Sequence, residues 1–180
     1  MKVFISGGCK NGKSYFAQHL AKKQQTGSLC YIATMNPVDS EDSERIARHR
    51  REREGWGFTT VEQPFDIEGI LDKCGSGSSF LLDSLTALLA NEMFLPGGKI
   101  NDLAADKITA GLVSILGQIR NIVIISDYIY SDAFLYDPLT EKYRKSLAEI
   151  DRAAALNCDV VLEIAYSNVI VHKGNYEKVF

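Results

Sequence analysis

No apolar run in this 180-residue chain approaches the roughly 18 residues that a membrane-spanning helix needs. The sequence also lacks a C-x-x-C pair, since its four cysteines, Cys9, Cys30, Cys74 and Cys158, are widely spaced beside apolar or loop segments. We therefore expect buried or half-buried free thiols in a reducing compartment rather than a disulfide framework. The chain shows no internal repeat, linker or low-complexity segment.

An excess of basic residues is missing as well, because the net charge is −3, with 46% hydrophobic and 24% charged residues. This balance is typical of a globular protein and disfavours general nucleic-acid binding, which requires a basic surface. Met1-Lys2 leads directly into a strand-like run, so no signal peptide is expected and the cytoplasm is the expected location. The length predicts one domain, residues 1–180, that buries roughly 70% of its unfolded surface.

Strand-like and helix-like patterns alternate along the chain. Strands are expected at 2–6, 29–33, 59–62, 79–83, 122–126, 159–164 and 169–171. Helices are expected at 13–23, 40–54, 67–74, 85–92, 104–120 and 137–156, and the stretch 97–102 is expected to be an exposed loop. Continuous apolar strands between helices predict an α/β fold, with a mostly parallel sheet covered by helices on both faces.

The stretch ISGGCKNGKS, residues 5–14, contains the full G-x-x-x-x-G-K-[ST] pattern between a predicted strand and a predicted helix. Its glycines let the backbone turn tightly and aim several N–H groups at one anion, next to the positive end of a helix. The Lys13 ammonium would reach the β- and γ-phosphates, and the Ser14 hydroxyl would bind Mg²⁺. The pattern therefore predicts a P-loop for a nucleoside triphosphate, formed by Gly7, Gly8, Cys9, Lys10, Asn11, Gly12, Lys13 and Ser14.

Such a loop needs a second carboxylate at the end of another strand to position the metal ion. Asp83 follows Phe80-Leu81-Leu82 and is the first candidate, while Asp127 follows the run 122–126 and is the second. Either carboxylate could instead cap the next helix.

The stretch ERIARHRRER, residues 44–53, contains one histidine, His49, with arginines on both sides of it. At helical spacing Arg45, His49 and Arg53 share one face. One interpretation is a solvated surface helix held by salt bridges. The other is chemical, because guanidinium groups disfavour imidazolium and hold phosphates through paired hydrogen bonds. A neutral His49 beside a clamped triphosphate could then attack the α-phosphorus and carry a nucleotidyl group.

Taken together, these residues resemble the bifunctional adenosylcobinamide kinase/adenosylcobinamide-phosphate guanylyltransferase family of cobalamin biosynthesis. The resemblance rests on GGCKNGKS, on YIAT at 31–34, on RIARH at 45–49, on RRER followed by TVEQP, and on LLDSLTALLANEMF at 81–94. Phe58 stands where the family usually has tryptophan, Ser84 stands at its usual cysteine position, and the segment between His49 and Glu62 is about one residue longer.

The resemblance implies phosphorylation of the aminopropanol hydroxyl of the corrinoid, with ATP or GTP as donor, followed by GMP transfer from GTP through His49. It implies that Lys13, His49 and Asp83 are catalytic and that Ser14 and Asp83 bind Mg²⁺. It also implies a homotrimer. The further nucleotide contacts that it implies are Ala33, Thr34, Arg50, Arg51, Arg53, Glu62 and Ser84.

The second half of the chain departs from the family pattern. Where the family has N-E-V-G after its central strand, this chain has Ser126-Asp127-Tyr128-Ile129, so a β-branched residue replaces a glycine that tolerates positive φ. The later F-R-D-x-x-G-x-x-N-Q motif of the family becomes YRKSLAEIDR here, which keeps the arginine as Arg144 but lacks the glycine and the N-Q pair. We expect the nearby tyrosines to be core and interface residues, and His19 to be a surface or packing residue.

Two other functions fit the same sequence. The chain could be a P-loop kinase for another small hydroxyl substrate, in which His49 only orients phosphates. It could also be a degenerate nucleotide-binding protein that transfers nothing, which the altered motif at 126–129 favours.

Overall fold

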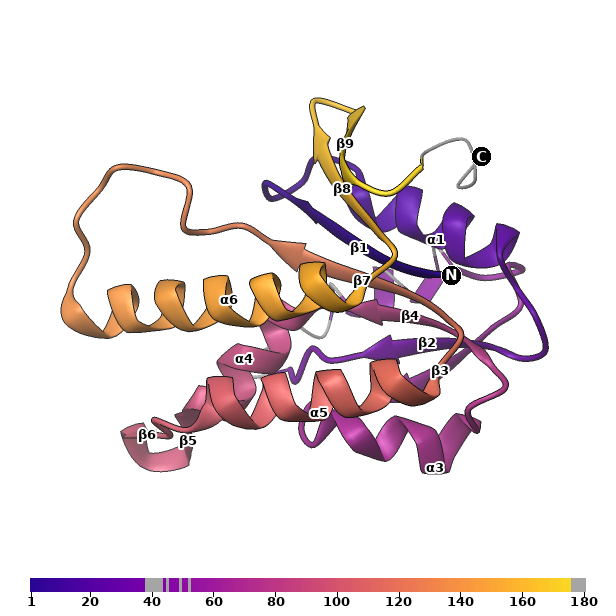
Figure 1. Cartoon of the computed structure of the whole chain (residues 1–180). Helices are drawn as coiled ribbons and strands as arrows, with labels where there is room; N and C mark the ends of the chain where they lie inside the picture. The colour runs from indigo at the N-terminus through magenta and orange to yellow at the C-terminus, as the bar shows by residue number, and fades with distance from the viewer. Residues whose placement is uncertain (38–43, 45, 49, 52, 176–180) are drawn as a thin grey trace.

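The computed structural model of the chain describes residues 1–37, 44, 46–48, 50, 51 and 53–175. Its main feature is a seven-stranded sheet in the order β3-β2-β4-β7-β1-β8-β9 (Figure 1). Neighbouring strands are parallel except β8 and β9, which form an antiparallel hairpin. The strands are β1 (Lys2–Gly7), β2 (Leu29–Ala33), β3 (Phe58–Glu62), β4 (Ser79–Asp83), β7 (Asn121–Asp127), β8 (Val160–Ala165) and β9 (Asn168–Lys173).

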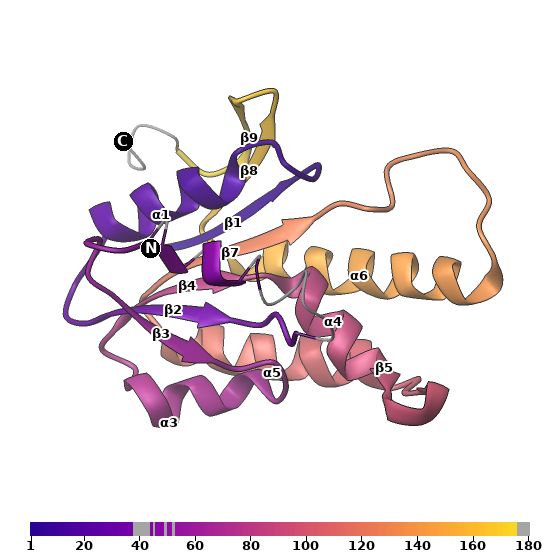
Figure 2. The same cartoon turned by 180° about the vertical axis from the view of Figure 1, so that it is seen from behind.

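Helices cover both faces of this sheet, as the sequence predicts. One face carries α1, and the opposite face carries α4, α5 and α6 with the short α3 at the margin (Figures 1 and 2). The helices are α1 (Lys13–Lys23), α3 (Ile70–Cys74), α4 (Leu85–Met93), α5 (Ala104–Gln118) and α6 (Pro138–Asn157). Short 3-10 turns lie at η1 (Ile67–Gly69) and η2 (Pro96–Gly98). The described residues at 44, 46–48, 50 and 51 are also helical.

The inner strands β1, β2, β4, β7 and β8 are mostly apolar because each face of the sheet packs against a helix layer, whereas the outer strands β3 and β9 are largely exposed. In β1 the alternation is visible residue by residue. Val3 and Ile5 pack in the core beneath α1, whereas Phe4 belongs to the larger core on the other face. The mostly parallel α/β sheet expected from the sequence is therefore confirmed.

Local signals located the helix starts well, and one predicted loop was partly wrong. The Asp137 carboxylate accepts hydrogen bonds from the backbone N–H groups of Leu139 (3.0 Å) and Thr140 (3.1 Å), so it caps α6 as expected. The stretch 97–102 is not an open loop throughout. Its Lys99–Ile100 segment forms β6 and pairs with β5 (Phe94–Leu95) in a small antiparallel hairpin.

The two-sided burial of the sheet predicts a large stability difference between two identical substitutions. Leu82 in β4 is fully buried, whereas Leu156 near the end of α6 is 78% exposed. We expect Leu82→Ala to lower the free energy of unfolding by about 2–5 kcal/mol, because it leaves a cavity. Leu156→Ala should change it by less than about 0.5 kcal/mol. Chemical denaturation of both variants measures this, and equal losses would contradict the described core.

Candidate nucleotide site

The parallel sheet gathers the predicted site residues at one edge. In the strand register Gly7 lies beside Asp127, and Ala33 lies beside both Asp83 and Glu62. These positions are the carboxyl ends of β1, β7, β2, β4 and β3. Open α/β sheets bind ligands outside this edge, so the topology places the phosphate loop and the acidic residues around a common space.

The phosphate loop is held in shape by its own backbone and by one amide. Gly12 has φ +88°, a left-handed conformation that suits glycine, immediately before α1 begins. Gly7 passes so close to β8 that a Cβ atom there would lie 2.6 Å from the Ile164 carbonyl oxygen. The Asn11 amide donates a hydrogen bond to that same carbonyl, and its oxygen accepts from the Lys13 backbone N–H at 3.2 Å. The loop is thereby fastened to the adjacent strand.

Lys13 lies over this loop with its ammonium group largely shielded from solvent. The side chain donates to the Gly8 carbonyl oxygen at 3.0 Å and forms an ion pair with Asp127. The Asp127 backbone N–H in turn donates to the Thr86 hydroxyl at 2.9 Å. The second carboxylate candidate of the sequence is therefore the direct partner of the loop lysine.

Asp83, the first candidate, has a different partner. The Tyr31 hydroxyl donates to an Asp83 carboxylate oxygen at 2.7 Å. The Arg53 guanidinium carbon lies 3.5 Å from the centroid of the Tyr31 ring, in a cation–π arrangement. Tyr31 thus links an acidic and a basic side chain from distant parts of the sequence.

Arg53 stands out because its guanidinium is buried without full compensation. The residue is only 6% exposed, and its Nε and Nη1 atoms have no hydrogen-bond partner in the part of the chain that the structure describes. Burying charged donors without partners is unfavourable, so the arrangement suits an anion that accepts from them.

Thr34 and Ser84 join β2 to the end of β4. The Thr34 hydroxyl donates to the Ser84 carbonyl oxygen at 2.8 Å and accepts from the Ser84 N–H at 2.7 Å. The Asp83–Ser84 peptide bond is cis, and the Ser84 hydroxyl caps α4 by accepting from the Ala87 N–H at 3.3 Å. Thr34 is fully buried, so its hydroxyl positions the Asp83–Ser84 segment.

A cavity of about 560 Å³ lies between these groups. It is lined by eight of the predicted site residues and by the second carboxylate candidate: Cys9, Lys10, Lys13, Ser14, Ala33, Arg53, Asp83 and Ser84, together with Asp127. Arg50 and Arg51 line a neighbouring hollow of about 550 Å³, which also reaches Arg53. Glu62 forms an exposed ion pair with Arg50. His49 lies outside the described residues, while Glu44, Ile46 and Arg48 from the same stretch border the cavity.

Sequence reasoning assigned no role to several residues of the cavity wall, chiefly Tyr31, Met35, Ala87 and Ile125. Tyr31 could have been found, because it stands two residues before the carboxyl end of a strand that adjoins Asp83. The apolar residues give no such signal, since their spacing is that of any buried strand or helix.

A buried carboxylate lies behind this wall. Asp151 of α6 is 3% exposed and accepts a hydrogen bond from the Tyr130 hydroxyl at 2.8 Å. Burial raises the pKa of the Asp151 carboxyl from 3.8 to about 6, and the nearby Asp127 acts in the same direction. Burial also raises the pKa of Tyr143, whose hydroxyl donates to the Thr86 carbonyl at 2.8 Å. This layer supports the Thr86–Asp127 contact from behind.

Hard oxygen donors are available for a magnesium ion. The described residues include no group of three or more His, Cys, Asp or Glu side chains that could hold a metal by themselves. Magnesium in nucleotide sites needs only one or two protein ligands besides phosphate oxygens and water. The Ser14 hydroxyl and the Asp83 carboxylate line the same cavity and fit that requirement.

Comparison with known proteins finds similarity to corrinoid enzymes. A family model for cobinamide kinase / cobinamide phosphate guanyltransferase matches residues 3–167. The bifunctional adenosylcobalamin biosynthesis protein CobP of Pseudomonas aeruginosa is 28% identical over 163 residues, covering 89% of this chain and 91% of that protein. The bifunctional adenosylcobalamin biosynthesis protein CobU of Escherichia coli K12 is 31% identical over 100 residues, covering 54% of this chain and 53% of that protein.

Solved structures with the same fold have little sequence in common with this chain. The flagellar accessory protein FlaH of Methanocaldococcus jannaschii matches with a TM-score of 0.52 at 14% identity, covering 96% of this chain and 78% of that one. A KaiC-like protein of Pyrococcus horikoshii matches with a TM-score of 0.52 at 13% identity, covering 97% and 79%. These matches confirm the P-loop NTPase-like fold. No helix in the described ranges has the length and apolar character needed to cross a bilayer.

The buried carboxylate on α6 predicts a pH-dependent stability difference. Because the pKa of Asp151 is raised in the folded protein, folding favours the protonated form. The protonated Asp151 carboxyl therefore contributes its full share to the stability of the folded protein below about pH 4, and this contribution is lost as the pH rises through about 6. At pH 8 we expect the free energy of unfolding of Asp151→Asn to be about 2–3 kcal/mol larger than that of the wild type, because the amide carries no charge to bury.

At pH 4 this advantage should be largely gone. Thermal and chemical denaturation across pH 4–8 measures it, with Glu149→Gln at an exposed position of the same helix as the matched control. A difference that does not change with pH would contradict the assignment.

Proposed function

Because the chain belongs to the cobinamide kinase/cobinamide phosphate guanyltransferase family, we propose that it phosphorylates adenosylcobinamide and then transfers GMP from GTP to the phosphorylated product. The observation that carries this proposal is the single cavity that joins the phosphate loop to the buried, incompletely paired Arg53. One triphosphate could contact both. The homologous bifunctional proteins of adenosylcobalamin biosynthesis support the same pair of reactions.

In the kinase step the loop N–H groups and Lys13 hold the β- and γ-phosphates of ATP or GTP. The corrinoid hydroxyl oxygen attacks the γ-phosphorus, the bond to the β-phosphate oxygen breaks, and the nucleoside diphosphate leaves. Lys13 must exchange part of its contact with Asp127 for phosphate oxygens. A carboxylate of the cavity, Asp83 in first place, receives the proton of the attacking hydroxyl. Magnesium held by Ser14 and Asp83 would neutralise phosphate charge.

In the transfer step GTP gives its GMP group to His49. The histidine nitrogen attacks the α-phosphorus and pyrophosphate leaves, so a phosphoramidate forms. The phosphate oxygen of the corrinoid then attacks the same phosphorus and releases the histidine. Arg50, Arg51 and Arg53 would neutralise the phosphates, and Ala33, Glu62 and Ser84 would surround the nucleoside. Thr34, which the sequence also assigned to the nucleotide, is fully buried and would act by holding the Asp83–Ser84 segment in place. The family resemblance further implies a homotrimer, and the cytoplasmic location expected from the sequence stays part of the proposal.

Covalent labelling tests the transfer step. We expect the protein incubated with α-³²P-GTP and Mg²⁺ to retain label after denaturation. The label should survive alkali, fall off in acid as a phosphoramidate does, and disappear in His49→Ala. His172→Ala is the matched control, because His172 is an exposed histidine of β9 that lines neither the cavity nor the hollow beside it. It should label like the wild type.

Two results would replace the transfer step. Absence of label with intact GTP binding, together with phosphorylation of a corrinoid or another hydroxyl substrate, would leave a P-loop kinase. GTP binding without turnover of any acceptor would leave a nucleotide-binding protein.

Arg53 provides a second test, of the phosphate clamp itself. Replacing a buried guanidinium that donates to phosphate should remove one or two charge-assisted hydrogen bonds, at roughly 1.5–3 kcal/mol each. We therefore expect Arg53→Ala to bind GTP about 10- to 100-fold more weakly in calorimetric titration. Arg120→Ala, at an exposed position between α5 and β7, is the control. Unchanged affinity in Arg53→Ala would mean that the guanidinium only packs against Tyr31.

A further inference from the structure

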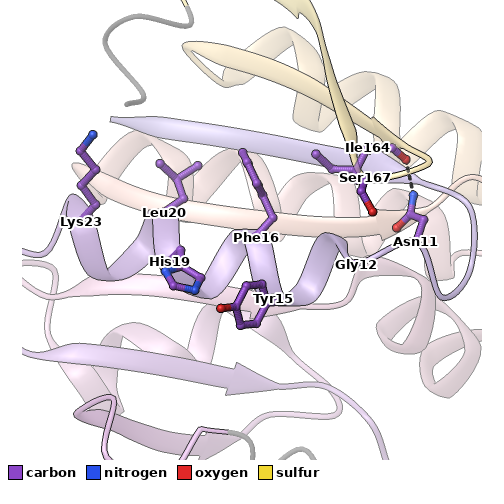
Figure 3. A pocket seen from close by; sticks show the side chains of 9 residues that line it. All are labelled: Asn11, Gly12, Tyr15, Phe16, His19, Leu20, Lys23, Ile164 and Ser167. Carbon is purple, nitrogen blue, oxygen red and sulfur yellow. Dashed lines mark hydrogen bonds between the residues drawn. The ribbon is translucent and has the colours of Figure 1, made fainter.

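A third hollow lies on the outer side of α1, apart from the cavity and the neighbouring hollow described above. Its volume is about 480 Å³, within the range of roughly 300–1,000 Å³ that ligand pockets occupy. Figure 3 shows its wall: Phe16, Leu20 and Lys23 point from α1 to the side on which β8 and β9 lie, whereas Tyr15 and His19 point to the other side of the helix. The helix contributes Tyr15, Phe16, His19, Leu20 and Lys23, with three- and four-residue spacings along each side.

This groove begins at the phosphate loop. Asn11 and Gly12 form one end of its wall, and Ile164 and Ser167 close the side opposite α1 (Figure 3). The Asn11 amide donates to the Ile164 carbonyl, so the loop and the turn are connected at this end. A phosphate chain held by the loop therefore has two ways out: into the cavity beside Asp83, or along α1 into the groove.

The groove offers flat, accessible rings at that end. Tyr15 directly follows the loop serine and is 64% exposed. Its ring meets the His19 ring edge-on at a centroid distance of 4.4 Å, and His19 meets Trp56 in the same way at 4.5 Å. The Ser167 hydroxyl stands across the groove, at a turn residue with φ +64°. Exposed aromatic rings beside a hydroxyl suit a nucleoside, because bases stack on aromatic side chains and the ribose forms hydrogen bonds with polar groups.

We propose that this groove binds the base and ribose of the nucleoside triphosphate that donates the phosphoryl group in the kinase step. The inference rests on the proposed function, and it adds a second nucleoside site to the one beside Ala33 and Glu62. The loop is then shared. The phosphoryl donor lies along α1 with its γ-phosphate toward Lys13 and Asp127, whereas the GTP of the transfer step extends toward His49.

The groove's position favours a nucleoside over a second copy of the chain as its occupant. It is contiguous with the phosphate loop, and its most exposed ring, Tyr15, stands at the loop end. The strongly exposed Tyr166 of the same turn lies outside the wall. Contiguity with the loop is expected for a ligand whose phosphates the loop holds, whereas a contact between two copies of the chain does not require it.

Calorimetric titration of the full chain with two probes tests the proposal. The probes are the non-hydrolysable ATP analogue AMP-PNP and inorganic tripolyphosphate, each with Mg²⁺. Loss of one stacked base contact corresponds to about a 5- to 20-fold weaker complex. We expect Tyr15→Ala to weaken AMP-PNP binding by that factor and to leave tripolyphosphate binding unchanged. Tyr166→Ala, the exposed tyrosine outside the groove, should bind both probes like the wild type.

Unchanged AMP-PNP affinity in Tyr15→Ala would overturn the proposal. If that variant also had an altered mass in sedimentation, the groove would be a contact between copies of the chain. Photolabelling of the wild type with 8-azido-ATP gives an independent readout, because the label should fall on α1 or on Ser167 of the turn. Label on β2 or β3 would overturn it.

These outcomes are separate from those of the proposed function. If the wild type carries no label at His49 but Tyr15→Ala weakens AMP-PNP binding as expected, only the transfer step of the proposed function is removed. Failure of the wild type to bind tripolyphosphate would overturn the phosphate loop on which both proposals rest.

Discussion

Parallel pairing of β1 with β7 and β8 is the constraint on which the site depends. It brings the glycine-rich end of β1 beside Asp127 on one side and beside the Ile164 carbonyl on the other. The pairing of β4 with β7 and with β2 then places Asp83 at the same edge, within reach of the Tyr31 hydroxyl from the middle of β2. A strand reversed within this set would send its last residue to the opposite edge. The antiparallel strand, β9, lies at the margin, where it leaves the loop and the acidic residues undisturbed.

The two buried cations of the cavity, Lys13 and Arg53, differ in how their charges are compensated. Lys13 has a carboxylate and a carbonyl as partners, so its charge is balanced within the protein. Arg53 is equally buried, but it rests on the Tyr31 ring with two donor atoms unpaired among the described residues. The Tyr31 hydroxyl donates to Asp83, so one side chain contacts both the guanidinium and the carboxylate. The unpaired Arg53 donors lie on the cavity wall, where an acidic ligand could reach them.

Sequence reasoning succeeded where a signal is local. The phosphate loop, the Asp137 cap and the strand ending in Asp83 are each written in a few consecutive residues, and the fold agrees with them. It could not foresee contacts that join distant segments, such as Lys13 with Asp127 or Arg53 over Tyr31. The β5–β6 hairpin was missed because glycines and a proline usually indicate a loop. The roles of His49 and of the other nucleotide-binding residues stay predictions.

The hydrogen bond from Asn11 to the Ile164 carbonyl has a thermodynamic consequence for binding. A glycine-rich loop is ordinarily costly to immobilise, because glycine loses more backbone freedom than any other residue. Here the amide and the close approach of Gly7 to β8 fix the loop in the folded protein itself. The entropic cost is met during folding, so the phosphate ligand that we propose would meet a preorganised loop and would retain more of its gross interaction energy as affinity.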